Sequence, residues 1–200
     1  MTKGKEQLNL ASTSPRRAQL LQQLQLCFHT LSVSIAEIPG DDELPEQYVQ
    51  RLALEKARAG WRLPTCDQTL PVLGSDTEVV LDGCIFGKPA DECDAQQMLQ
   101  QLSGRTHQVL TAIAVKSGEN EQVVLSQSKV HFRSLSIKEI NAYCKTGEPM
   151  GKAGAYAIQG LAAVFISHLQ GSFSGVMGLP LLETAELLRD FAVKIPGLDD

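Results

Sequence analysis

Long strand-forming segments that end in tight turns fill the middle of this sequence. Residues 72–81 are apolar and rich in β-branched side chains, and Asp82-Gly83 after them is a strong hairpin signal before Ile85 and Phe86. Two more long strands are predicted over residues 106–116 and 122–132, on either side of a Ser-Gly-Glu-Asn turn. Hairpins join antiparallel neighbours, so part of the sheet is expected to be antiparallel.

Helix signals alternate with these strands. Ser14 is placed to cap a helix whose first residue is Pro15, and Ser136 with Glu139 has the spacing of a capping box. Further helices are predicted near residues 45–60, 92–103 and 180–191. A short strand is predicted over residues 8–11, and a hairpin over residues 161–168 and 173–177. Together these signals predict an α/β fold with a mixed sheet.

The chain has 200 residues, which is the length of one domain, so a single domain over residues 1–200 is expected. Hydrophobic residues make up 43% and charged residues 20%, as in globular proteins, which excludes wholesale disorder. The last stretch, residues 192–200, is predicted to be a frayed tail.

The net charge of −5 argues against a protein that coats nucleic acid or an anionic membrane, so neither is expected as a partner. No apolar run approaches the ~18 residues that span a bilayer, and the first residues lack the apolar core of a signal peptide. The five cysteines have no CxxC spacing. These features predict a cytoplasmic protein with free thiols.

Two arginines stand where helices usually carry acidic residues. Arg16 and Arg17 fall in the first turn of the predicted helix, where the positive end of the helix dipole disfavours cations by roughly 0.3–1 kcal/mol each. A bound anion would offset this cost, because backbone N–H groups, the hydroxyls of Ser12 or Ser14 and the guanidinium groups could all donate to a phosphate. The alternative is two exposed arginines without a partner.

A carboxylate interrupts the apolar strand in the middle of the chain. Asp76 lies in Gly74-Ser-Asp-Thr77, and a buried carboxylate is costly unless it is paired or has a chemical role. It could hold a divalent cation, deprotonate water, or simply accept hydrogen bonds from nearby backbone. Glu78 shares a strand face with Asp76 by the period of two, and would either assist it or face solvent.

Three further polar side chains are candidates for ligand binding. Lys56 falls on the apolar face of its helix, from which it would reach either water or a phosphate cleft. Lys88 follows the Asp82-Gly83 hairpin. Gln159 lies in a glycine-flanked loop, and its amide could both donate to and accept from a base edge. Each alone is more typical of an ordinary solvated side chain.

Taken together, the motifs resemble one family. They occur in the order Ala11-Ser-Thr-Ser-Pro-Arg-Arg17, Gly74-Ser-Asp-Thr77, Gly87-Lys-Pro89, Gly104-Arg-Thr-His-Gln-Val109, Lys152-Ala-Gly-Ala-Tyr156, Ile158-Gln-Gly160 and Gly178-Leu-Pro180. This series is similar to that of the Maf (septum formation) family of nucleoside triphosphate pyrophosphatases, from about Leu8 to Leu188. The resemblance implies an elongated mixed sheet flanked by helices, with two lobes and a central cleft, akin to the inosine triphosphatases.

The resemblance also implies a reaction, which is hydrolysis of a nucleoside triphosphate to the monophosphate and pyrophosphate. By family similarity Asp76 would accept the proton of water and also contact a divalent metal, Mg²⁺ or Mn²⁺, together with Glu37. The expected substrate-binding residues are Ser12, Arg16, Arg17, Lys56, Thr77, Lys88 and Gln159. Family members are often dimeric, so a homodimer is a further expectation.

The residue at position 159 bears on the choice of substrate. The glutamine resembles the branch of the family that acts on dTTP and UTP, whereas the branch that acts on 7-methyl-GTP usually carries glutamate there. The sequence departs from the family pattern at Gly151, where aspartate is usual, at Gly87, where an acidic or other residue is often found, and at Glu78, where an apolar residue is usual.

Two alternatives to a dTTP and UTP pyrophosphatase follow. One keeps the chemistry and changes the base, to 7-methyl-GTP or another modified nucleotide. The other is a regulator of cell division that binds nucleotide without hydrolysing it, which is the kind of effect that the family name reflects.

Overall fold

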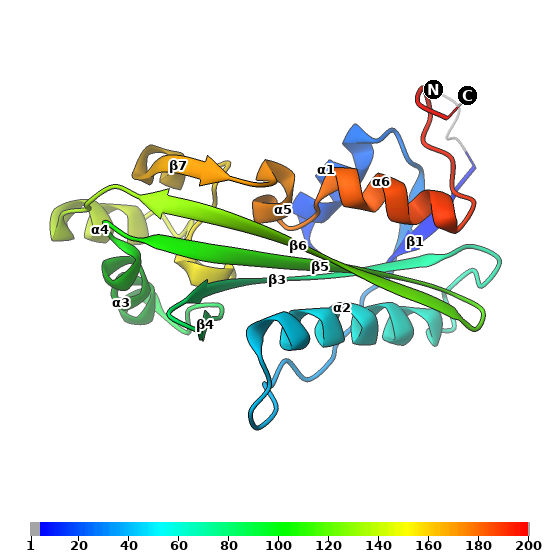
Figure 1. Cartoon of the computed structure of the whole chain (residues 1–200), viewed down its shortest axis with the longest axis horizontal. Helices are drawn as coiled ribbons and strands as arrows, with labels where there is room; N and C mark the ends of the chain where they lie inside the picture. The colour runs from blue at the N-terminus through cyan, green and yellow to red at the C-terminus, as the bar shows by residue number, and fades with distance from the viewer. Residues whose placement is uncertain (1–4, 200) are drawn as a thin grey trace.

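The computed structural model describes residues 5–199, which form an elongated α/β fold around a single mixed sheet (Figure 1). The seven strands have the order β2-β1-β3-β5-β6-β7, and β4 pairs with the far end of β3. β1 is parallel to β2 and β3, and the other pairs are antiparallel. The predicted fold class is therefore confirmed. The strands are β1 (Leu8–Leu10), β2 (Phe28–Thr30), β3 (Val72–Leu81), β4 (Cys84–Phe86), β5 (Thr106–Ser117), β6 (Asn120–Phe132) and β7 (Ile166–Gln170).

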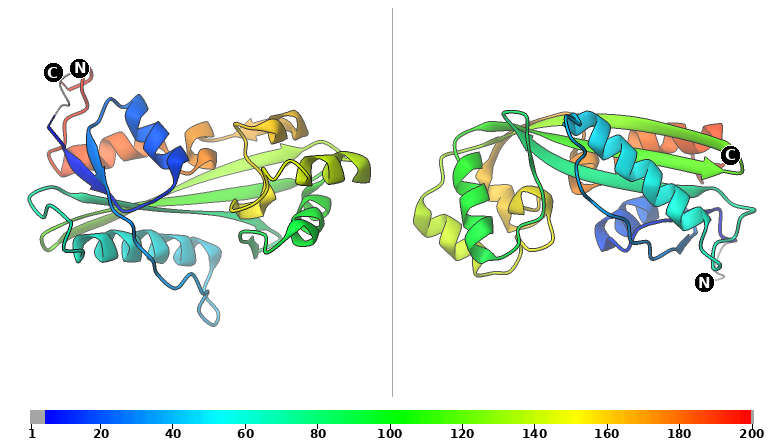
Figure 2. Two further views of the ribbon diagram at one scale, coloured as in Figure 1. Left: turned by 180° about the vertical axis from the view of Figure 1, so that it is seen from behind. Right: turned by 90° about the horizontal axis from the view of Figure 1, so that it is seen from below.

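The helices cover the sheet in two groups. α2 lies along one face of the long strands, whereas α1, α5 and α6 lie on the other face (Figures 1 and 2). α3, α4 and the 3₁₀ segments η1 and η2 lie at the end of the sheet that is farther from α6. The bounds are α1 (Pro15–Gln23), α2 (Pro45–Trp61), α3 (Glu92–Leu102), α4 (Ile137–Cys144), η1 (Ala153–Ala155), η2 (Leu161–Phe165), α5 (Phe173–Met177) and α6 (Leu181–Asp190).

Separate apolar cores hold the two ends of the molecule. One packs α3, α4 and η1 against the sheet around Phe132, Leu99 and Tyr143. Another packs α1 and α6 against β1 and β3 around Leu10 and Leu188. Burial of this apolar area drives each end to fold, and β3 runs through both, so its polar residues are held between them.

Strand β3 presents different residues to its two faces. Gly74, Asp76 and Val80 face α2, as Val80 packs in the same apolar cluster as Val49 and Ala53 of that helix. Ser75 and Thr77, one residue on, contact the opposite layer. The period of two therefore places Asp76 and Glu78 on the α2 side, as the sequence predicts.

Local helix signals behave as predicted. Ser14 Oγ accepts a hydrogen bond from the amide of Arg17, with Pro15 as the first helical residue. Ser136 and Glu139 form the expected capping box. Short-range chemistry of this kind depends on neighbouring residues alone, which is why the sequence is sufficient to predict it.

The hairpin predicted around Gln170 and Gly171 is wrong. Residues 161–165 form a 3₁₀ helix, β7 pairs with β6, and residues 173–177 form α5. Ser172 caps α5 by accepting a hydrogen bond from the amide of Gly175, 2.9 Å away. The cap at Ser172 and the pairing of β7 with β6 therefore determine the secondary structure here, and the turn signal does not.

The chain ends also differ from the expected frayed tail. Val193 and Ile195 are buried in the core around α6, and Arg189 forms an ion pair with Asp199. Gln7 donates to the carbonyl of Lys194 at 3.0 Å, which joins the two ends of the chain. Asp200 lies outside the described residues. No helix within residues 5–199 is long and apolar enough to cross a membrane.

Candidate active site

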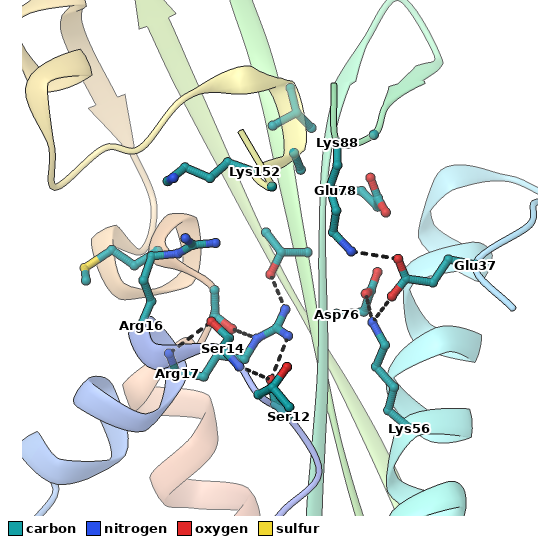
Figure 3. Close-up of a pocket in the computed structure, with 18 of the residues that line it drawn as sticks. Ser12, Ser14, Arg16, Arg17, Glu37, Lys56, Asp76, Glu78, Lys88 and Lys152 are labelled. Carbon is teal, nitrogen blue, oxygen red and sulfur yellow. Dashed lines mark hydrogen bonds and ion pairs between the residues drawn. The ribbon is translucent and has the colours of Figure 1, made fainter. Parts of the chain in front are cut away.

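A cavity of about 730 Å³ lies between the two ends of the molecule, against β3. Its walls come from segments far apart in the chain, including the start of α1, the loop before α2, α2 itself and the loops that follow β4 and α4. Every predicted site residue lines it: Ser12, Arg16, Arg17, Glu37, Lys56, Asp76, Thr77, Lys88 and Gln159. Figure 3 shows the central part of this arrangement.

An ion-pair chain forms the wall on the α2 side. Lys56 Nζ lies 2.6 Å from Asp76 Oδ1 and 2.6 Å from Glu37 Oε1, and Lys88 Nζ lies 2.8 Å from Glu37 Oε2 (Figure 3). The two lysines and their hydrogen bonds outweigh partial burial and lower the pKa of Glu37 to about 2. Lys56 therefore reaches the cleft rather than open water, which settles the choice left by the sequence.

Gly74 allows α2 to bring Lys56 this close. A Cβ at Gly74 would lie 2.3 Å from the carbonyl oxygen of Ala53 and 2.6 Å from the nitrogen of Ala57. Both atoms belong to the backbone of α2, which cannot move without moving the helix. The glycine at this position thus fixes the distance between α2 and β3.

Glu78 lies beside this wall in an unusual environment. Its side chain is only 8% exposed, and its Oε2 is a buried acceptor without a hydrogen-bond partner in residues 5–199. Burial, followed by the negative charges of Asp76 and Glu37, raises the pKa of Glu78 to about 8. The alternative in which Glu78 faces solvent is therefore wrong, and a second carboxylate does stand next to Asp76.

Arg17 joins three motifs beneath the cavity. Its guanidinium donates to the carbonyl of Gly178 at 2.9 Å, to Ser12 Oγ at 3.3 Å and to Thr77 Oγ1 at 3.2 Å. Ser75 Oγ donates to the same carbonyl at 3.0 Å. Because every guanidinium nitrogen has a protein partner, Arg17 holds the start of α1, β3 and the turn after α5 in register.

The opposite wall is cationic. Arg16 and Lys152 lie on the other side of β3 from the carboxylates (Figure 3). Desolvation lowers the pKa of both groups, and the charge of Arg16 lowers that of Lys152 further. With the dipole of α1 behind them and no acidic residue in the first turn of that helix, these cations have the surroundings of an anion site.

The loop that carries Lys152 keeps its order although Gly151 replaces the usual aspartate. Lys152 Nζ donates to the carbonyls of Glu148 and Met150. Glu148 in turn accepts hydrogen bonds from the hydroxyl of Tyr143 and the amide of Leu161. Gly151 has a positive φ of 71°, a conformation that glycine adopts without strain.

Two other lining residues lie apart from the charged centre. Gln159 is exposed and lines the cavity from the loop after η1. Tyr156 is buried below that loop, where its hydroxyl lies 2.9 Å from Nε2 of His107. His107 is thus a histidine of the apolar core.

Sequence reasoning missed two polar residues of the cavity. Tyr48 lines it from α2, but its position on the apolar helix face reads as ordinary core. Lys152 was noted only as part of a motif, although its place directly before a glycine-containing turn was a signal for a ligand contact. Residues 5–199 contain no ready-made group of three metal-ligating side chains.

Comparisons with known proteins identify the family of this chain. The sequence profile of the family described as Maf-like protein matches residues 7–191. This chain belongs to the Maf family. The recognition made from the motifs is therefore confirmed.

Three curated relatives of this Maf chain share one name. A protein of Xanthomonas axonopodis pv. citri (strain 306) named dTTP/UTP pyrophosphatase is 56% identical over 92% of this chain and 98% of its own length. Proteins with the same name from Methylococcus capsulatus and Pasteurella multocida are 54% and 50% identical. Those alignments cover 91% and 94% of this chain, and 89% and 98% of the relatives.

Proposed function

We propose that this protein is a nucleoside triphosphate pyrophosphatase that hydrolyses dTTP and UTP to the monophosphate and pyrophosphate. The relatives that share half or more of its residues bear that name. The observation that carries the proposal is Asp76, whose carboxylate is oriented by Lys56 at the base of a cavity with a cationic far wall. That pairing of a fixed base with phosphate-binding charges suits hydrolysis of a phosphoanhydride.

Charge neutralisation is the first contribution of the residues. A triphosphate carries several negative charges that repel an attacking water, and Arg16, Lys88 and Lys152 bring positive charge to the cavity. Lys88 is held by its ion pair with Glu37 and Lys152 by two backbone carbonyls before substrate arrives, so both can stabilise the charge that develops on the leaving pyrophosphate with little reorganisation. Ser12 and the N-terminus of α1 add hydrogen-bond donors to the same phosphates.

Proton transfer is the second contribution. Asp76 Oδ1 is engaged by Lys56, whereas Oδ2 is buried and accepts no hydrogen bond within residues 5–199. Oδ2 would take a proton from water as the water oxygen bonds to one phosphorus of the α–β bridge. The bridging oxygen then leaves with the other product. Base catalysis of this type contributes about 10²–10⁴-fold to the rate.

The residues also suit a divalent cation, for which we propose Mg²⁺ or Mn²⁺. Asp76 and Glu37 are the ligands that the family resemblance implies, and the partnerless Oδ2 of Asp76 has two lone pairs, so it could contact a hard cation with one and accept the proton with the other. Mg²⁺ is usually bound by one or two carboxylates together with substrate phosphates, so two protein ligands would be enough. When bound, the cation would withdraw charge from the phosphate oxygens.

Base recognition is assigned to Gln159 at the exposed side of the cavity. A pyrimidine imide edge presents both a donor and acceptors, and a glutamine amide can match both. Thr77 would act at one remove, because its hydroxyl accepts from Arg17 rather than pointing to a free ligand position. We also place the protein in the cytoplasm and expect a homodimer.

A nucleotide panel with product identification tests the function. Purified protein with Mg²⁺ is expected to release pyrophosphate from dTTP and UTP, and to do so faster than from 7-methyl-GTP or unmodified purine triphosphates. Faster release from 7-methyl-GTP would move the protein to the other branch. Release of single phosphate would indicate a different phosphatase, and binding without any product would favour a nucleotide-binding regulator.

A further inference from the structure

Glu78 is a charged-type residue of the cavity to which the proposed reaction gives no role. It lies two residues after Asp76 on β3, on the same face, and lines the same cavity (Figure 3). Only 8% of its surface is exposed. A buried carboxylate costs free energy unless it is paired or binds a ligand, so its presence needs a reason.

The hydrogen-bond partners of the three carboxylates differ sharply. Both oxygens of Glu37 are taken, Oε1 by Lys56 and Oε2 by Lys88. Asp76 uses Oδ1 for Lys56 and leaves Oδ2 without a partner, and Oε2 of Glu78 is likewise without one in the described part of the chain. The unused acceptor atoms of this wall thus belong to Asp76 and Glu78, and not to Glu37.

The ion pairs of the wall also set Glu78 apart from Glu37 and Asp76. Lys56 and Lys88 supply two positive charges, and both are engaged in the ion pairs with Glu37 and Asp76. Glu78 takes part in none of the ion pairs formed among residues 5–199. One carboxylate on this wall therefore has no cation of its own, next to a neighbour with an open oxygen.

We propose that Glu78 is the second protein ligand, beside Asp76, of the divalent cation, and that Glu37 instead holds the two lysines in place. The inference rests on the proposed function for its metal-bound triphosphate, and it changes which residue completes the site. Hard cations select carboxylate oxygens, and two such oxygens from one strand face, completed by phosphate and water, are a usual shell for Mg²⁺ or Mn²⁺.

Direct Mn²⁺ binding to the nucleotide-free protein tests this assignment without measuring turnover. The loss of the free Mn²⁺ signal in electron paramagnetic resonance would be followed at millimolar protein for the unchanged chain and for Glu78→Gln, Glu37→Gln and Glu186→Gln. Glu186 is exposed on α6 and makes a matched control for the lost charge. We expect Glu78→Gln to weaken binding about tenfold or more. Glu37→Gln and Glu186→Gln should change it by less than about threefold.

Several outcomes overturn the proposal. Binding by a folded Glu78→Gln protein that matches the unchanged chain removes Glu78 from the site, and an equal loss in Glu37→Gln removes the distinction between the two residues. A merely structural role for Glu78 would lower the melting temperature of Glu78→Gln and leave Mn²⁺ affinity intact. We expect instead an unchanged melting temperature, because glutamine keeps the shape of a side chain that makes no ion pair within residues 5–199.

A second measurement does not depend on any variant folding. Crystals of the unchanged protein soaked in Mn²⁺ should show an anomalous-scattering peak within coordination distance of Asp76 Oδ2 and Glu78 Oε2. A peak on Glu37 alone, or no peak, contradicts the assignment. Mn²⁺ at Glu78 in a protein that releases no pyrophosphate would reject the proposed function and leave this site standing, whereas turnover with Mn²⁺ elsewhere would do the reverse.

Discussion

Lys56 is the side chain on which the charged wall depends. It is mostly buried and contacts both Asp76 and Glu37, so it sets the orientation of the base and the position of the loop before α2. Removing one member of a buried ion pair leaves the other charge uncompensated, which costs far more than losing a pair at the surface. Lys88 reaches the same wall from a largely exposed position, and the two lysines therefore differ in what they contribute.

Replacing Lys56 should destabilise the fold, whereas replacing Lys88 should not. We expect Lys56→Met to lower the free energy of unfolding by about 3–5 kcal/mol, because buried Asp76 then loses its ion-pair partner and Glu37 keeps only Lys88. Lys88→Met should lower it by less than about 1 kcal/mol, since its side chain is 58% exposed. Urea unfolding of both variants measures the difference, and equal losses would mean that Lys56 is solvated in solution.

Asp76 should be needed for turnover and not for folding. Asp76→Asn keeps the shape of the side chain but removes the base, so pyrophosphate release should fall by about 10²–10⁴-fold. The circular dichroism spectrum should match that of the unchanged protein, and the melting temperature should fall less than in Lys56→Met, because Lys56 keeps its ion pair with Glu37. A folded variant with undiminished turnover would take the role of base away from Asp76.

Substrate choice can be tested at Gln159. Gln159→Glu replaces an amide that donates and accepts by a group that only accepts when ionised, so dTTP and UTP turnover should fall relative to other triphosphates. The melting temperature should stay the same because the residue is exposed. Relative rates over the same nucleotide panel provide the measurement, and an unchanged order of substrates would exclude Gln159 from base recognition.

The contact between α2 and β3 shows how one pair of elements positions the chemistry. Gly74 lets the helix backbone lie directly on the strand, and the next strand residues facing that helix are Asp76 and Glu78. The contact at Gly74 thus fixes the positions of α2, β3 and the two carboxylates relative to one another. The sequence predicts both elements from their apolar patterns, but not their separation, which depends on residues about twenty positions apart.

Gly74→Ala should disturb this contact. The added methyl group would overlap the backbone of α2, and overpacking of this type costs about 1–3 kcal/mol. Displacement of α2 would also carry Lys56 away from Asp76 and reduce turnover. Gly40→Ala is the matched control, because its Cβ meets only ordinary contacts with Glu43. Thermal unfolding of the two variants should differ clearly, and equal melting temperatures would show that α2 yields easily.

Features that depend on neighbouring residues could be predicted from the sequence, whereas contacts between distant residues could not. The cap at Ser14 and the capping box at Ser136 depend on residues a turn away, so the sequence was sufficient. Arg17 joins residues from three distant segments, and nothing near it in the chain indicates those partners. The motif series placed the site residues in one cavity through resemblance, while the pairing of Glu37 with both lysines required the folded chain.

The whole molecule consists of two apolar ends with polar chemistry between them. Because β3, β5 and β6 run through both ends, neither can move independently of the long strands that bear the site. The end built on α3 and α4 contains a buried histidine, His107, which is 2% exposed and packs against Phe132 and Tyr156. Its protonation links the stability of the whole chain to pH.

Stability should fall in mild acid because of His107. Burial lowers the pKa of His107 from 6.5 to about 4. Between these two pH values the histidine is protonated in the unfolded chain and neutral in the folded chain. The contribution of the neutral histidine to the free energy of unfolding is fully present above pH 6.5. It is lost as the pH falls toward 4, and the total loss is roughly 3 kcal/mol. Urea unfolding at pH 7 and pH 5 should show a shallower pH slope for His107→Phe, and identical slopes would exclude this origin.

The contact between Gln7 and Lys194 brings the first and the last segments of residues 5–199 together at one place, beside α6. A short peptide linker could close that gap and turn the polypeptide into a ring without stretching the sheet. The exposed β5–β6 turn at Gly118 would then be a natural point at which to reopen it. A chain with the same segments in this permuted order would thus form the same fold.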